Sequence, residues 1–373
     1  MLRSPHPPSQ EDLGYLLALV RFQKLGAVRL GNLRNFFPTY KDIFHGSREE
    51  WLAASIPPKV TEAFFAAKAT LNPEQEWNLL ETTGAHAIAF EDDRYPSLLR
   101  EIFDPPAVLF VRGELSFNEK THLAVVGSRK ATHYGTRVVK ELVQPLAQAG
   151  FVIVSGLAIG IDACAHAAAL ESGGTTVAVL GAGVDDNNIY PSQNRSLASH
   201  IMAGGGAVIS EFPIGTHVLK QNFPFRNRII AGMSHATLVV EAAEKSGSLI
   251  TARSALESNR EVFAVPGSIH APLCAGPNTL IKAGAIPVTE PNDILETFGL
   301  SGKTHSLSVY SPASEEERNL MEVLGGEPIH IDEIVRASAL PPATITSTLT
   351  LLEIEGAVRH VGGRFYVRDA SKT

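Results

Sequence analysis

Short, continuously apolar runs alternate with segments of helical periodicity through the middle of the chain. The runs are rich in β-branched residues and cover residues 123–127, 152–155, 176–181, 207–210, 237–241, 261–266 and 285–289. Runs without polar alternation predict parallel strands covered on both faces, and the amphipathic segments between them predict crossover helices. We therefore predict an α/β fold, with an extended Rossmann-like parallel sheet over residues 86–298. A ligand of such a sheet binds outside the carboxyl ends of the strands.

The pattern before this domain is helical. Apolar residues between positions 13 and 20 have helical spacing, and prolines between 38 and 73 separate short segments. Residues 1–85 are therefore predicted to be a small helical domain that packs on the sheet. Residues 24–33 and 56–67 resemble degenerate helix-hairpin-helix units. The first of them lacks the compact Gly-x-Gly hairpin that would grip a phosphate, so packing is favoured over DNA contact.

The end of the chain predicts a linker and a third domain. Residues 299–314 are rich in Ser, Gly and Pro, which is typical of a linker. Residues 315–373 predict a winged helix with three helices and a two-stranded wing. The helices are expected at 315–324, 331–338 and 344–356, and the strands at 358–361 and 365–367.

Composition excludes several classes of protein. Apolar residues make up 44% and charged residues 19% of the 373 positions, so a sizeable core can be buried. The net charge is −7, from 32 basic and 39 acidic residues, which argues against binding nucleic acid through a bulk basic field. A local basic groove is still compatible with this charge.

Targeting signals and cysteine chemistry are not indicated. Residues 1–12 are polar and Pro-rich, and no run of about 18 apolar residues occurs, so we expect neither a secretion signal nor a membrane span. Cys164 and Cys274 are too few and too far apart for a disulfide framework or a Cys-x-x-Cys metal site. We interpret them as small apolar residues of a protein in a reducing cytoplasm.

Glycines and small hydroxyl residues follow one predicted strand after another. Residues 113–300 hold 20 of the 31 glycines. Glycine lets the backbone approach a ligand, and Ser and Thr hydroxyls with free N–H groups at helix starts form anion cradles. Because parallel strands end at the same edge, these loops predict one phosphate-binding crest. The loops are 127–132, 155–162, 181–185 and 246–251.

Basic side chains accompany this crest. Arg129 follows Gly127 and Ser128 directly, and Arg195 follows Tyr190 and Pro191 at a short distance. Arginine forks suit phosphate oxygens, and aromatic rings can stack nucleic-acid bases. The segment Phe223-Pro-Phe-Arg226-Asn-Arg228 combines both residue types. A structural alternative is that Arg226 or Arg228 pairs with Glu211 or Glu241 inside the fold.

Catalytic and metal-binding patterns are weak. Asp162 and His166 share one helix face, but no further ligands occur at ordinary metal-site spacing. We interpret Asp162 as a residue of the helix start and His166 as packing under the crest. The chain has neither a G-x-S-x-G elbow nor an NTPase P-loop. We expect no catalytic residues, no metal and no cofactor.

A series of motifs between residues 85 and 295 resembles the DprA (Smf) family of DNA-processing proteins of bacterial transformation, in the family's order. The motifs are Val-Gly-Ser-Arg at 126–129, Ser-Gly-Leu-Ala-Ile-Gly-Ile-Asp at 155–162, Tyr-Pro at 190–191, Ser-Glu-Phe-Pro at 210–213, Phe-Pro-Phe-Arg-Asn-Arg at 223–228 and Ser-Gly-Ser-Leu-Ile-Thr at 246–251. The flanks are more weakly similar to the family's N-terminal SAM-like domain and its C-terminal winged helix.

The resemblance implies a single-stranded DNA-binding recombination mediator without catalytic turnover. Members dimerise through the Rossmann-like domain, protect incoming strands in natural transformation and help load RecA past single-strand-binding protein, which is a further candidate partner. The family's key arginine corresponds to Arg129. The predicted DNA-binding residues are Gly127, Ser128, Arg129, Lys130, Ser155, Gly156, Arg195, Arg226, Asn227, Arg228, Ser246, Gly247, Ser248 and Thr251.

Two points stay open at this stage. Many members of the family have a lysine after the Tyr-Pro pair, where this chain has Ser192, so either Lys130 or Arg195 compensates or the affinity is lower. The alternative function is a nucleotide-processing enzyme of the lysine-decarboxylase-like phosphoribohydrolase type. Those enzymes carry a Gly-Gly-x-Gly-Thr-x-x-x-Glu loop, and Ser246-Gly-Ser248 stands in its place here.

Overall fold

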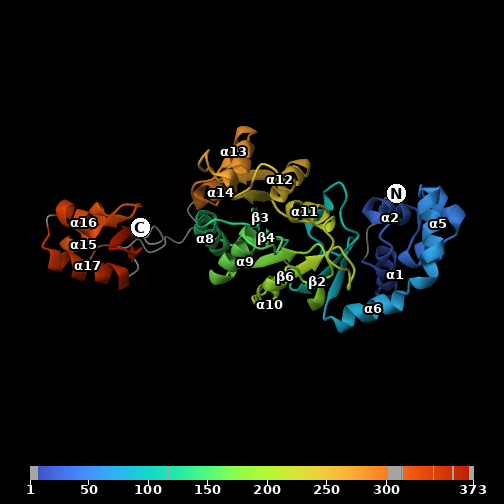
Figure 1. Cartoon of the computed structure of the whole chain (residues 1–373). Coiled ribbons are helices and arrows are strands. Elements are labelled where there is room, and N and C mark those ends of the chain that lie inside the picture. Colours follow the sequence, from blue (N-terminus) through green and yellow to red (C-terminus); the bar gives the residue numbers. More distant parts are fainter. Residues whose placement is uncertain are drawn as a thin grey trace. The chain divides into compact units, whose positions relative to one another are not determined.

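A computed structural model describes residues 7–115, 118–300, 312, 314–338, 340–354 and 357–368 of the chain. The contacts divide the chain into two compact units, Met1–Leu300 and Ser301–Thr373. The first unit contains a large sheet with helices on both faces, and the second is a small mixed module (Figure 1). In the described residues no helix has the length and apolar character that a bilayer span requires.

The sheet of the first unit has the strand order β1-β2-β6-β5-β4-β3-β7-β8-β9 over its described residues. The seven predicted runs all form strands, and these pair in parallel, which confirms the Rossmann-like α/β interpretation. Their bounds are β3 (His122–Val126), β4 (Val152–Ser155), β5 (Thr176–Val179), β6 (Ala207–Ser210), β7 (Ala236–Val239), β8 (Glu261–Ala264) and β9 (Ile286–Pro287).

Two antiparallel strands extend one edge of the sheet. β1 (His86–Ala89) pairs with β2 (Val108–Gly113), and β2 pairs with β6. Sequence reasoning missed both strands, although Val108 to Val111 is an apolar run with every residue buried. The loop and short helix α7 (Ser97–Arg100) between them carry prolines and charges that hide the pairing.

Alternate residues of the central strands belong to two different cores. Leu123 and Val125 of β3 pack with the α8 and α9 side, whereas Ala124 and Val126 pack with α11 and α12. Figure 1 shows α11 and α12 on one face of the sheet and α9 and α10 on the other. The helices of this part of the chain are α8 (His133–Gln148), α9 (Ile161–Glu171), α10 (Arg195–Ala203), α11 (Asn222–Gly232), α12 (Gly247–Glu257), α13 (Ala275–Lys282) and α14 (Pro291–Thr297).

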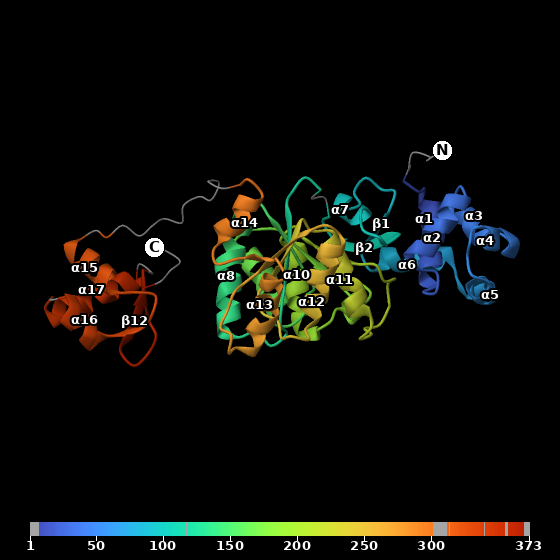
Figure 2. The same cartoon turned by 90° about the horizontal axis from the view of Figure 1, so that it is seen from above.

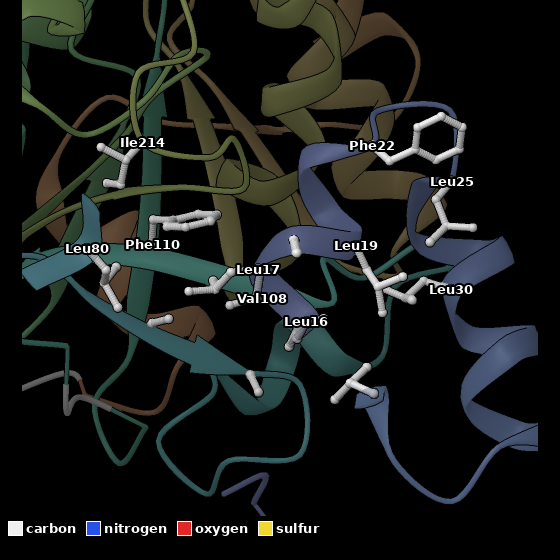
Figure 3. Packing of buried hydrophobic residues seen from close by; sticks show 14 of the residues in the cluster. Leu16, Leu17, Leu19, Phe22, Leu25, Leu30, Leu80, Val108, Phe110 and Ile214 are labelled. Carbon is white, nitrogen blue, oxygen red and sulfur yellow. The ribbon is translucent and has the colours of Figure 1, made fainter. Parts of the chain in front are cut away.

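The N-terminal helices share a core with the β1–β2 edge. Leu16 and Leu17 belong to the same buried cluster as Val108 and Phe110 (Figure 3). Arg21 links α1 to the loop after β6, because its Nη2 donates a hydrogen bond to the carbonyl of Ile214 at 2.9 Å. The helices are α1 (Gln10–Arg21), α2 (Gly26–Phe36), α3 (Tyr40–His45), α4 (Arg48–Ala53), α5 (Pro58–Ala67) and α6 (Pro73–Thr82).

The second unit has the winged-helix elements that the sequence predicts. The helices are α15 (Glu315–Val323), α16 (Ile331–Ser338) and α17 (Pro342–Ile354), and the strands are β10 (Ile329–His330), β11 (Val358–His360) and β12 (Phe365–Arg368). β10 is an additional short strand that pairs with β12. Figure 2 shows this module from above. Of the predicted linker, residues 301–311 and 313 lie outside the described residues.

The shared core predicts that the N-terminal helices and the sheet unfold together. Leu16→Ala removes a side chain with no exposed surface and should lower the free energy of unfolding by about 2–5 kcal/mol. Chemical denaturation followed by tryptophan fluorescence, which reports Trp51 and Trp77 of the N-terminal helices, and by hydrogen exchange at the amides of β3 and β4 should give one coincident transition at lower denaturant. Val28→Ala, at a half-exposed position of α2, is the control and should change stability by less than about 0.5 kcal/mol. Separate transitions for the two probes would contradict a shared core.

Candidate nucleic-acid interface

A cavity of about 360 Å³ lies at the carboxyl ends of β3 and β7. The loops that follow these strands line it together with residues from the start of α9 and from α11 and α12. The lining residues are Val126, Gly127, Ser128, Arg129, Lys130, Ala158, Asp162, Phe223, Pro224, Arg226, Asn227, Ile230, Ala243, Lys245, Ser246, Gly247, Ser248, Ile250 and Thr251. The cavity therefore lies at the sheet edge where a doubly wound fold binds its ligands.

The start of α12 presents polar groups to this cavity. Ser246 is the N-cap, and its hydroxyl accepts a hydrogen bond from the N–H of Ser248. The two serine hydroxyls also lie 2.7 Å apart. Asn227 of α11 holds this turn by donating to the carbonyl of Gly247 at 3.2 Å. Free N–H groups and the positive end of the helix dipole make such a turn favourable for an anion.

Three cations at the cavity form no ion pair with the acidic side chains of the described residues. Arg129, Lys130 and Lys245 are exposed, and none of them lies within 4 Å of a described carboxylate. The Arg129 guanidinium lies over the ring of Phe223, 5.0 Å from its centroid. Tyr190 lies next to that ring, with centroids 5.8 Å apart. A cationic surface thus adjoins an aromatic one.

Arg226 supplies a buried positive charge to the same cavity. Its side chain is 3% exposed, and its Nη1 donates to the carbonyl of Val179. Burial lowers the pKa of Arg226 to about 10, an effect that the Asp162 carboxylate opposes. The guanidinium therefore remains charged at neutral pH. Its Nε has no partner among the described residues.

Asp162 and His166 are both buried and form hydrogen bonds inside the fold. Asp162 accepts a hydrogen bond from the N–H of Gly156 at 3.1 Å, and burial raises the pKa of its carboxyl while Arg226 opposes that rise. His166 Nδ1 lies 2.6 Å from the hydroxyl of Thr176, which in turn donates to the carbonyl of Ile153. Burial lowers the pKa of His166 to about 3, so the ring is neutral. The described part of the chain holds no cluster of three or more His, Cys, Asp or Glu residues able to bind a metal.

Ten of the fourteen predicted DNA-binding residues meet in this cavity. They are Gly127, Ser128, Arg129, Lys130, Arg226, Asn227, Ser246, Gly247, Ser248 and Thr251. Ser128 also shapes its own loop, because its hydroxyl accepts the N–H of Lys130 at 3.0 Å. The sheet topology alone brings together residues that lie more than 120 positions apart in the sequence.

The other four predicted residues lie outside the cavity lining. Ser155 is fully buried and donates to the carbonyl of Val125 at 2.6 Å, and Gly156 lies against the Arg226 guanidinium. Arg195, at the start of α10, donates to the carbonyl of Asn187 at 3.1 Å. Arg228 forms ion pairs with Glu211 and Asp104.

Arg228 pairs with acidic residues inside the fold, as the structural alternative to DNA contact predicted. Its guanidinium pairs with Glu211 at 2.5 Å and with Asp104 at 3.0 Å, and this network ties α11 to the loop after α7. The two carboxylates neutralise this partly buried cation inside the fold. Arg228 does not line the cavity. Glu241 has another role, because it accepts the N–H of Thr132 at 2.9 Å at the start of α8.

Three lining residues were not on the predicted list although the sequence held a signal for them. Lys245 immediately precedes the Ser-Gly-Ser loop, so its charge belongs to the same turn. Phe223 and Ile250 contribute apolar surface to the cavity. Ser192, the position at which the resemblance led us to expect a lysine, is exposed at the start of the short helix Ser192–Asn194 and does not line the cavity.

This combination of a Rossmann-like sheet, a cationic cavity and a winged helix defines a class of DNA recombination mediators. A family model for DNA recombination-mediator protein A matches residues 86–299, and a model for the DprA winged helix domain matches residues 308–364. The chain belongs to the DprA (Smf) family.

Individual relatives agree with this assignment. Protein Smf of Escherichia coli is 44% identical over 78% of this chain and 79% of its own length, and Protein Smf of Synechocystis is 36% identical over 96% of this chain and all of its own length. The crystal structure of DprA from Streptococcus pneumoniae has a TM-score of 0.63 at 35% identity, covering 78% of this chain and 98% of that protein. A Helicobacter pylori DprA structure, reported for its single-stranded DNA-binding mode, has a TM-score of 0.51 at 27% identity, covering 57% of this chain and 95% of that one.

The tight packing of Arg226 predicts a strong requirement for glycine at position 156. A Cβ at Gly156 would lie 2.6 Å from Cζ of Arg226, so Gly156→Ala should displace this buried cation and lower stability by about 1–3 kcal/mol. Gly31→Ala is the matched control, because a Cβ on this exposed residue of α2 meets no atom and should stabilise the helix by about 0.5–1 kcal/mol. Thermal unfolding measures both. Equal stability of the two variants would contradict the packing described here.

The buried neutral histidine predicts acid destabilisation. The ordinary pKa of 6.5 falls to about 3 for His166 in the folded state, so between these values the unfolded chain binds a proton that the folded chain does not. The free energy of unfolding should therefore fall as pH drops below 6.5, by about 1.4 kcal/mol per pH unit from this group. Urea denaturation at a series of pH values from 7.5 to 5 gives the slope of the free energy of unfolding against pH. This slope should be shallower for His166→Gln than for the parent. His200→Gln, at an exposed position of α10, should leave the slope unchanged.

Proposed function

We propose that this protein binds single-stranded DNA at the cavity and acts as a recombination mediator. One observation carries this proposal. Arg129, Lys130 and Lys245, which form no ion pair among the described residues, line one cavity together with glycine and serine loops, and the Arg129 guanidinium lies over the ring of Phe223, which adjoins Tyr190. Family membership and the described binding mode of the Helicobacter pylori relative support it.

The arrangement suits the two parts of a nucleotide strand. The start of α12, Arg129, Lys130 and Lys245 can hold phosphate oxygens through N–H groups and charge. Phe223 and Tyr190 can stack unpaired bases, which every base permits. Binding of this kind is tolerant of sequence and weakens with salt in proportion to the number of phosphate contacts.

The acidic composition shapes this binding. The net charge of −7 leaves no bulk positive field, so attraction comes from the few cations around the cavity. We therefore propose a moderate salt dependence and weak binding to duplex DNA.

The winged helix fits this proposal, because α17 contains no lysine or arginine to contact duplex phosphates. Contact with protein, or weak duplex binding, is the proposed role of that module.

Further aspects of the proposal rest on family membership. We propose that the protein works in the cytoplasm, dimerises through its Rossmann-like domain, protects incoming single strands in natural transformation and loads RecA on strands covered by single-strand-binding protein. We also propose that it has no catalytic turnover. Asp162 is the one carboxylate among the described lining residues, and its interaction with the Gly156 N–H supports a structural rather than a catalytic role.

Arg129 provides the direct test. Arg129→Ala removes an exposed guanidinium from the cavity and should weaken binding to a labelled oligo-dT by about tenfold or more, because hydrogen bonds to charged groups contribute about 1.5–3 kcal/mol. The slope of log affinity against log salt should become shallower by about 0.7. Fluorescence anisotropy across a salt series measures both quantities.

The matched control lies on the neighbouring helix. Arg137 of α8 is exposed, pairs with Glu141 at 3.5 Å and does not line the cavity. Arg137→Ala should keep the parent affinity and salt slope. Equal losses in the two variants would indicate a general charge effect, and unchanged affinity in Arg129→Ala would remove Arg129 from the interface.

A further inference from the structure

We infer that the wing of the winged helix, residues 358–368, binds a short acidic protein segment that also carries apolar side chains. The inference rests on the protein contact proposed for this module, and it names the surface and the chemistry of the partner. It does not depend on DNA binding at the cavity. Three features carry it, namely the segregation of charge within the module, two arginines without ion pairs, and apolar side chains exposed beside them.

Charge is segregated within the module. The wing contains Arg359, Arg364 and Arg368 and no aspartate or glutamate. The helices α15, α16 and α17 together contain seven acidic residues and two arginines. The wing is therefore the part of this module whose charge attracts an anion, although the helices around it are acidic.

Two arginines of the wing can accept a partner. Arg359 lies on β11 and Arg364 in the turn between β11 and β12, and both are exposed. Neither forms an ion pair with a described residue. Arg368 is only partly exposed and donates to the carbonyl of Met321 at 3.4 Å. Arg359 and Arg364 can therefore each bind a carboxylate of another molecule.

The outer face of the wing carries apolar side chains beside these cations. Arg359 pairs with Val367 in the register of β11 and β12. The N–H of Val361 donates to the carbonyl of Phe365 at 3.0 Å. Because paired residues of antiparallel strands point to the same side, these four side chains share one face, and Tyr366 on the other face packs on the core of the module. Val361 is 46% and Phe365 41% exposed.

Protection of a sheet edge does not account for this surface. β11 is an edge strand in the sheet order β10-β12-β11, and charged side chains on edge strands prevent pairing with other chains. That role explains an exposed arginine. Exposed Val361 and Phe365 have the opposite effect, because apolar surface favours association. A partner that is both acidic and apolar satisfies the arginines and covers the apolar side chains together.

Nucleic acid fits this surface less well than an acidic peptide. A duplex carries one phosphate charge per about 1.7 Å of its axis, so stable binding needs several cations along its length. The wing offers two exposed arginines, and α17, which packs against β11, contributes Glu353 and no lysine or arginine. A short peptide can place its few carboxylates on the two guanidinium groups and its apolar side chains on Val361 and Phe365.

Peptide binding to the full-length protein tests the inference. The probe is a fluorescein-labelled peptide in which Phe and Leu are interspersed among Asp, and anisotropy is followed as protein is added. One comparison peptide has Asn in place of every Asp, and another has Ser in place of Phe and Leu. We expect the probe to bind at least about tenfold more tightly than either comparison peptide, because each of them loses one half of the contact.

Variants of the wing locate the binding site. Arg359→Gln and Arg364→Gln keep the length of the side chain and remove its charge, so both should fold normally. Each should weaken peptide binding by about two- to fivefold, as expected for an exposed ion pair, and the double variant by about tenfold. Arg318→Gln is the matched control, because Arg318 is an exposed arginine of α15 without an ion pair to a described residue. It should keep the parent affinity.

Oligo-dT binding by the same proteins separates this inference from the DNA-binding function. Equal peptide affinity of the parent and the double variant, or loss of peptide binding in Arg129→Ala instead, would overturn the wing as the peptide site. Loss of DNA binding without loss of peptide binding in the double variant would make the wing a nucleic-acid surface and also overturn it. If the parent binds the peptide through the wing but does not bind oligo-dT, the function at the cavity fails and the inference stands.

Discussion

The buried guanidinium of Arg226 is the constraint on which the site depends. A charge at 3% exposure is tolerated only where fixed dipoles and an opposite charge replace its water. The carbonyl of Val179 and the carboxylate of Asp162 serve this purpose, and Gly156 leaves the space that the guanidinium occupies. The ends of β4 and β5 and the start of α9 are thus arranged around one cation, and this arrangement places Arg226 and Asp162 in the lining of the cavity.

This arrangement explains how an acidic protein can belong to a family of DNA recombination mediators. The formal charge of −7 is a sum over the whole chain, whereas the interaction with an anion depends on charges within about a Debye length of about 8–10 Å. Arg129, Lys130 and Lys245 lie around the cavity without carboxylates within 4 Å among the described residues. Arg228, by contrast, is neutralised by Glu211 and Asp104. The local pattern of pairing, and not the total, decides where an anion is favoured.

Much of the fold could be predicted because burial on both faces leaves a simple signal. The seven parallel strands are apolar throughout, and the winged-helix elements have clear periodicity and turn residues. The antiparallel strands β1 and β2 were missed because a loop with prolines and charges separates them and because the second partner of β2 is remote, with β6 about 95 positions later. The apolar spacing of Leu16 and Leu17 indicated a helix, but not that its core continues into Phe110 of the sheet.

The sequence by itself determined that glycine and hydroxyl loops follow successive parallel strands, and this placed ten predicted residues at one edge, since parallel strands all end on the same side. Only the tertiary structure decided the state of each side chain. Ser155 turned inward, Arg228 became part of an ion-pair network, and Lys245 and Phe223 joined the cavity. The physical reason is that a sequence motif specifies a residue's position along the backbone. Solvent exposure, ion pairing and pKa depend on neighbours that folding brings from distant parts of the chain.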